Sequence, residues 1–120
     1  MLERTHLERI TDENVGDFLE AERAVLVLAR STCACCVTYE QQIQAQIERG
    51  ALDAVRIGQL VLDRPGSLQF KRANPWLAGL IYLPRTLLYQ GGQQVDAFDT
   101  DDGSVLVQHV RAALGTPSET

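Results

Sequence analysis

Three cysteines stand within four residues of one another, at Cys33, Cys35 and Cys36, and the chain has no others. An odd, clustered set of thiols is not the disulfide framework of a small secreted protein. In a reducing compartment, clustered thiols act in catalysis, respond to oxidants or bind a metal ion. These three thiols are therefore the first candidate functional groups of this sequence.

The spacing of Cys33 and Cys36 favours a redox pair. Residues three apart in the first turn of a helix lie on one face, so these two thiols can meet as a disulfide. The unpaired amides and the dipole at a helix N-terminus stabilise a thiolate, which is the form that attacks disulfides. We therefore predict Cys33 as the nucleophile and Cys36 as the resolving thiol. Cys35 points to a different face and is either a surface bystander or an auxiliary thiol with a regulatory role.

The cysteines lie where an apolar run gives way to a helical pattern. Residues 24–29 read AVLVLA, which is typical of a central strand covered on both faces. A helix over residues 36–49 follows, with Gly50 as its C-terminal stop. We expect Ser31 and Thr32 to satisfy backbone groups at the start of this helix.

The other segments alternate in the same way. The sequence predicts a helix over residues 12–22, a strand over 55–62, a short helix over 67–73, hairpin strands over 86–90 and 93–98 joined at Gly91-Gly92, and a last helix that ends near Leu114. The element order βαβαβαββα indicates an α/β fold with a central mixed sheet flanked by helices on both faces. A length of 120 residues fits a single domain over 1–120, with 115–120 as a flexible tail.

Three segments together resemble the thioredoxin family, and the resemblance covers nearly the whole chain. They are the apolar strand that leads to Cys33 and Cys36, residues 60–66 (LVLDRPG), and residues 79–92 (GLIYLPRTLLYQGG). The resemblance implies a thioredoxin-like fold, in which Pro84 follows a cis peptide bond and its loop faces the cysteine pair.

The resemblance also marks residues around the cysteines that shape the site. Leu83 belongs to the proline loop, and Thr32 stands directly before Cys33, where thioredoxins usually carry a tryptophan. Arg85 follows the proline, and we expect its guanidinium group to lie near Cys33 and stabilise the thiolate. The family's buried acid falls at Val27 and its partner lysine at Gln59, so the usual proton carrier is missing here.

Composition and charge exclude several other classes of protein. The net charge is −5, from 16 acidic and 11 basic residues, which argues against a nucleic-acid binder. No apolar run approaches the roughly 18 residues of a membrane span. The first eight residues are charged and resemble no export signal, so we expect a cytoplasmic protein that acts without a membrane.

These observations predict a thiol–disulfide oxidoreductase that works through the Cys33/Cys36 dithiol. The expected partners are a disulfide-bearing protein or small-thiol substrate, and an unidentified protein or small-thiol reductant. No nucleotide or flavin motif is present, so no cofactor is expected. A resident metal ion is not expected either. Two alternatives stay open: a non-catalytic redox sensor or adaptor, and a module that binds a soft metal ion through Cys33, Cys35 and Cys36.

Overall fold

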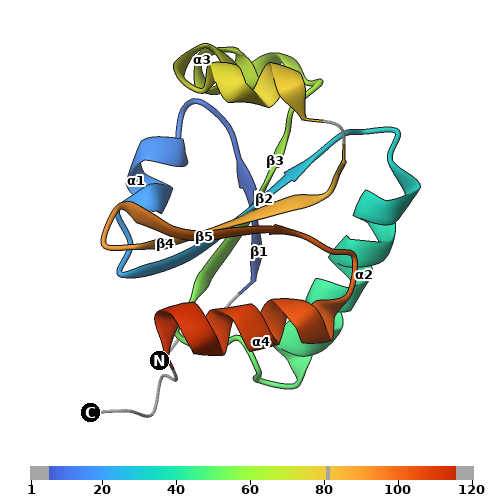
Figure 1. Cartoon of the computed structure of the whole chain (residues 1–120), viewed down its shortest axis with the longest axis vertical. Helices are drawn as coiled ribbons and strands as arrows, with labels where there is room; N and C mark the ends of the chain where they lie inside the picture. The colour runs from blue at the N-terminus through green and yellow to red at the C-terminus, as the bar shows by residue number, and fades with distance from the viewer. Residues whose placement is uncertain (1–5, 81, 116–120) are drawn as a thin grey trace.

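A five-stranded sheet forms the centre of the molecule (Figure 1). A computed structural model describes residues 6–80 and 82–115 of the chain. The strands are β1 (Leu7–Ile10), β2 (Arg23–Ala29), β3 (Arg56–Val61), β4 (Arg85–Gln90) and β5 (Gln93–Asp99), and they lie in the order β1-β3-β2-β4-β5. Strands β1, β3 and β2 are parallel, whereas β4 runs antiparallel to β2 and β5 antiparallel to β4. The predicted mixed sheet is confirmed.

Helices cover both faces of this sheet (Figure 1). They are α1 (Val15–Leu19), α2 (Ala34–Glu48), α3 (Leu68–Ala73) and α4 (Gly103–Leu114), with short 3-10 helices η1 (Pro65–Ser67) and η2 (Pro75–Gly79) on either side of α3. Helices α2 and α4 contribute to one apolar cluster, and α1, α3 and η2 contribute to the other. No helix among the described residues is long and apolar enough to cross a membrane.

Strand β2 lies between the two apolar clusters. Val25 and Val27 face the cluster of α2 and α4, while Ala24, Leu26 and Leu28 face the cluster of α1 and α3. Each of these five side chains is at most 2% exposed. The prediction that residues 24–29 form a central strand covered on both faces is therefore confirmed, because alternate side chains of a strand point to opposite faces.

Helix α1 is shorter than the predicted span of residues 12–22, since it begins only at Val15 and ends at Leu19. Asp12, the first residue of the predicted span, lies before this helix. Its carboxylate accepts hydrogen bonds from the backbone N–H groups of Gln69 and Phe70, both at 2.9 Å, in the first turn of α3. A side chain assigned by local pattern to one helix thus caps a different helix.

Glycines occupy the hairpin turn, as the sequence predicts, and the position that follows the last helix. Gly91 and Gly92 join β4 to β5 with φ angles of +58° and +88°, which glycine adopts without the strain of a Cβ atom. Gly115 follows α4 with φ at +74°. The remainder of the predicted tail, residues 116–120, lies outside the described residues.

Gly58 on β3 leaves room for one side chain from β1 and one from α1 to pack directly over the strand. A Cβ atom at this position would overlap the side chain of Ile10 and lie 3.0 Å from Phe18 Cε1. We predict that Gly58→Ala lowers the free energy of unfolding by about 1–3 kcal/mol, because the added methyl group overpacks this contact. The measurement is urea denaturation followed by circular dichroism.

The matched control for this prediction is Gly16→Ala in α1. Nothing lies within 4 Å of a Cβ atom added there, and alanine favours a helix more than glycine does. We expect no loss of stability in this variant. Equal unfolding free energies for the two variants would contradict the close packing at Gly58.

Candidate active site

Helix α2 begins directly after Cys33, which is its N-terminal capping residue. The backbone N–H of Cys36 donates a hydrogen bond to Cys33 Sγ at 3.1 Å. The helix starts at Ala34, earlier than the predicted start at residue 36, and Cys33 takes the capping place expected of Ser31 or Thr32. An N–H group directed at this sulfur is placed to stabilise a negative charge there.

Cys36 lies one helical turn further along and is only 3% exposed. Burial raises the pKa of its thiol to about 12, and a hydrogen bond with Cys33 adds to the increase. Cys33 is half-buried and Cys35 is exposed, so the three thiols have different access to solvent. The pair therefore consists of an accessible thiol and a sheltered one that stays protonated at neutral pH.

The proline loop faces the accessible thiol. The Leu83–Pro84 peptide bond is cis, as the resemblance implies, and Pro84 is buried. Cys33 Sγ donates a hydrogen bond to the carbonyl oxygen of Leu83 at 3.8 Å. The structure thus brings together Cys33, Cys36, Leu83 and Pro84, although they come from segments about fifty residues apart in the sequence.

Arg85 has a partner that the sequence did not suggest. Its Nη1 atom lies 3.2 Å from a carboxylate oxygen of Asp99, the residue opposite it on β5. Its Nε atom is buried and finds no hydrogen-bond partner among the described residues. The carboxylate competes for the positive charge, so the expected action of Arg85 on the Cys33 thiolate stays a prediction.

A hydrogen-bonded pair of residues distant in the sequence holds the loop that leads to the cysteines in place. Ser31 donates to the carboxylate of Asp63 twice, from Oγ at 2.6 Å and from its backbone N–H at 3.0 Å. These hydrogen bonds hold the pKa of the Asp63 carboxyl below its usual value. The sequence did not suggest this role for Asp63. Thr32, by contrast, is exposed, and its side chain makes no hydrogen bond within the described part of the chain.

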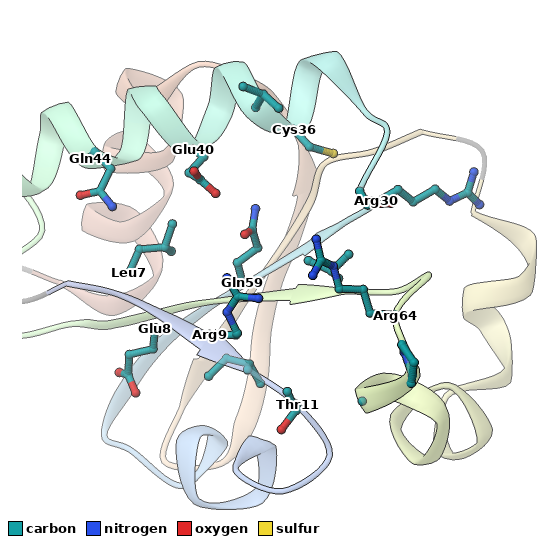
Figure 2. A pocket seen from close by; sticks show the side chains of 16 residues that line it. Leu7, Glu8, Arg9, Thr11, Arg30, Cys36, Glu40, Gln44, Gln59 and Arg64 are labelled. Atoms are coloured by element: carbon teal, nitrogen blue, oxygen red, sulfur yellow. The ribbon is translucent and has the colours of Figure 1, made fainter.

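Below the cysteines, β2 carries an apolar side chain and β3 carries an amide side chain. Val27 on β2 is 2% exposed and pairs in register with Gln59 on β3. Gln59 and Cys36 both line a pocket of about 520 Å³ that reaches from the buried thiol toward β1 (Figure 2). This pocket cannot be predicted from local sequence patterns, because its walls come from four separate segments of the chain.

The structure gives no support to the metal hypothesis. Over residues 6–80 and 82–115, no three His, Cys, Asp or Glu side chains lie where they could hold one metal ion together. Cys36 is buried while Cys35 is exposed, and these orientations keep the three thiols from converging. A single-chain site built from Cys33, Cys35 and Cys36 does not fit this geometry.

Comparison with known proteins identifies the fold. No family model matches the chain, and no curated protein matches its sequence at a significant level. Among solved structures, the short form of spinach chloroplast thioredoxin f is 13% identical with a TM-score of 0.75, over 95% of this chain and 99% of that one. A mutant thioredoxin from Halobacterium salinarum is 13% identical with a TM-score of 0.74, over 94% of this chain and 95% of that one. Thioredoxin from Trypanosoma brucei brucei is 12% identical with a TM-score of 0.73, over 95% of this chain and 96% of that one.

These likenesses and the site geometry define the class of the molecule. The chain has the thioredoxin fold, and it carries a pair of cysteines with two residues between them at the start of α2. Because the sequence identities are only 12–13%, these likenesses establish the fold and not the activity. The thioredoxin-like architecture predicted from the sequence is confirmed.

We predict that the two paired thiols react very differently in a Cys35→Ser variant. At about pH 8, iodoacetamide modifies Cys33 but leaves Cys36 untouched, because thiolates react and Cys36 is a buried thiol with a pKa of about 12. The measurement is mass spectrometry of peptides after timed alkylation. Equal modification rates would contradict the buried environment of Cys36.

The same raised pKa predicts how stability changes with pH. Between about pH 9 and pH 12 the Cys36 thiol ionises in the unfolded chain but not in the folded protein. Its contribution to stability is therefore complete below this interval and is lost as the pH rises through it. We expect the Cys36→Ala variant to lose less stability than the wild type over this interval in urea denaturation.

Proposed function

We propose that this protein is a thiol–disulfide oxidoreductase that acts through Cys33 and Cys36. The observation that carries the proposal is the hydrogen bond from the Cys36 backbone N–H to Cys33 Sγ at 3.1 Å. The accessible sulfur lies at the start of α2, opposite the cis-proline loop and with a second thiol one turn behind it. A nucleophile of this kind needs access, anion stabilisation and a resolving thiol, and all three are present.

The exchange proceeds in two steps in the reducing direction. The Cys33 thiolate attacks one sulfur of a substrate disulfide, a new sulfur–sulfur bond forms, and the other substrate sulfur leaves as a thiolate. Cys36 then gives up its proton to solvent and attacks Cys33, which breaks the mixed disulfide and releases the second substrate thiolate. The pair has supplied two electrons and ends as a Cys33–Cys36 disulfide.

The surface beside the proline loop suits an extended substrate. An extended chain can pair with backbone groups next to Pro84, as the resemblance to thioredoxins implies. Tyr82 is 70% exposed and stands directly before Leu83, where it offers an apolar contact to a bound segment. The proposed substrate is thus a disulfide-bearing protein or the disulfide form of a small thiol, and the reductant is a second protein or a small thiol. A cytoplasmic location fits this reducing chemistry.

The experiment compares three serine variants with a disulfide-bearing protein substrate. Cys33→Ser should lower turnover by about 100-fold or more, because the nucleophile is lost. Cys36→Ser should attack the substrate but accumulate the mixed disulfide, which mass spectrometry detects as one substrate bound through Cys33. Cys35→Ser is the matched control and should keep its turnover, since this exposed thiol takes no part in either step.

A redox titration in graded thiol buffers completes the test. We expect a single midpoint for a reversible Cys33–Cys36 disulfide while Cys35 stays free. Reversible formation of that disulfide without substrate turnover would favour the redox sensor or adaptor. Failure to form it at all would overturn the proposal.

A further inference from the structure

A second site lies on the side of α2 that faces β1 and β3. The pocket of about 520 Å³ runs from Cys36 along the first turns of α2, and β1 and the end of β3 line its other side (Figure 2). Its size is within the range of about 300–1,000 Å³ that small-molecule sites occupy. Cys33 is not among its lining residues, so the space is distinct from the surface where a substrate disulfide meets the nucleophile.

Two positively charged groups point into this pocket. Figure 2 shows the guanidinium groups of Arg9, from β1, and Arg64, from the loop after β3, directed into the space, while Arg30 extends away from them at the rim. Among the described residues, neither Arg9 nor Arg64 forms an ion pair with a carboxylate. Two arginines without an ion-pair partner thus line one pocket, although Arg64 also interacts electrostatically with the neighbouring Asp63 carboxylate.

Two glutamates also line the pocket, and one of them is neutralised by an ion pair. Glu8 is neutralised by Arg56, which donates to its two carboxylate oxygens at 2.7 and 3.0 Å. Glu40 lies one helical turn after Cys36, and its carboxylate points into the pocket from the α2 side (Figure 2). No ion pair holds Glu40 within the part of the chain that the structure describes. The pocket therefore has a cationic wall at the strands and one anionic group on the helix.

We propose that this pocket binds a small acidic molecule with a free amine, such as an acidic amino acid or dipeptide. Its carboxylates pair with Arg9 and Arg64, because the guanidinium fork matches a carboxylate in geometry and charge. Its ammonium group faces Glu40. The amide of Gln59, which Figure 2 shows between the two walls, supplies a neutral hydrogen-bonding group. This inference does not depend on the proposed redox activity.

Isothermal titration calorimetry with the dipeptide L-aspartyl-L-glutamate tests the cationic wall. We expect one dipeptide bound per chain, and about a tenfold loss of affinity in Arg9→Gln and in Arg64→Gln, since each variant removes one charged hydrogen-bond partner. Arg111→Gln in α4 is the control, because it changes the net charge equally and does not line the pocket. No binding by the wild type, or equal losses in all three variants, would overturn the proposal.

A second ligand tests the role of Glu40. N-acetyl-aspartyl-glutamate keeps the carboxylates but lacks the ammonium group, so the wild type should bind it about tenfold more weakly than the free dipeptide. Glu40→Gln should bind the free dipeptide more weakly and the acetylated one more tightly, which removes the preference. An unchanged preference in this variant would show that Glu40 does not face the amine and would refute that assignment.

Chemical-shift mapping by NMR locates the bound dipeptide. Backbone amides of Gln59 and Gly66, which line the pocket, should shift on titration, whereas those of α4 should not. Shifts confined to the surface around Pro84 would place the ligand at the other site and contradict the inference.

Discussion

The burial of β2 on both faces is the constraint on which the rest of the structure depends. Its side chains are at most 2% exposed from Ala24 to Ala29, so the chain that leaves this strand emerges from the middle of the sheet. Helix α2 starts at this point and lies against β4, where the Tyr39 hydroxyl and Thr86 Oγ1 form a buried hydrogen bond of 2.7 Å. Because β4 follows Pro84 directly, this contact fixes the cysteine turn relative to the proline loop.

One helical turn then gives the two paired thiols opposite properties. Cys33 is half-buried and receives the N–H of Cys36, whereas the Cys36 thiol is buried and its pKa rises to about 12. The difference comes from position on the helix, since the capping residue of α2 faces the proline loop and the first turn carries Cys36 into the protein. The proposed nucleophile and the proposed resolving thiol thus differ in burial.

The region beneath the cysteines combines uncharged buried strands with a pocket that carries charged side chains. Val27 and Gln59 leave no buried charge in the paired strands, whereas Arg9, Arg64 and Glu40 in the neighbouring pocket are exposed to solvent. Arg9, Arg64 and Glu40 can remain unpaired because water solvates them, which makes them available to a ligand. A polar pocket and an apolar core therefore lie next to each other on the same face of the sheet.

The sequence by itself determined the features that depend on local spacing. The apolar run at 24–29, the glycines of the hairpin and the two-residue gap between Cys33 and Cys36 predicted the central strand, the β4–β5 turn and the thiol pair, because periodicity and backbone freedom are local properties. The cis bond before Pro84 came only through the resemblance to thioredoxins. The tertiary structure alone decided the partner of each charged side chain. Asp12 caps α3, Asp63 holds Ser31, and Asp99 pairs with Arg85, since long-range hydrogen bonds form between whichever groups the fold brings together.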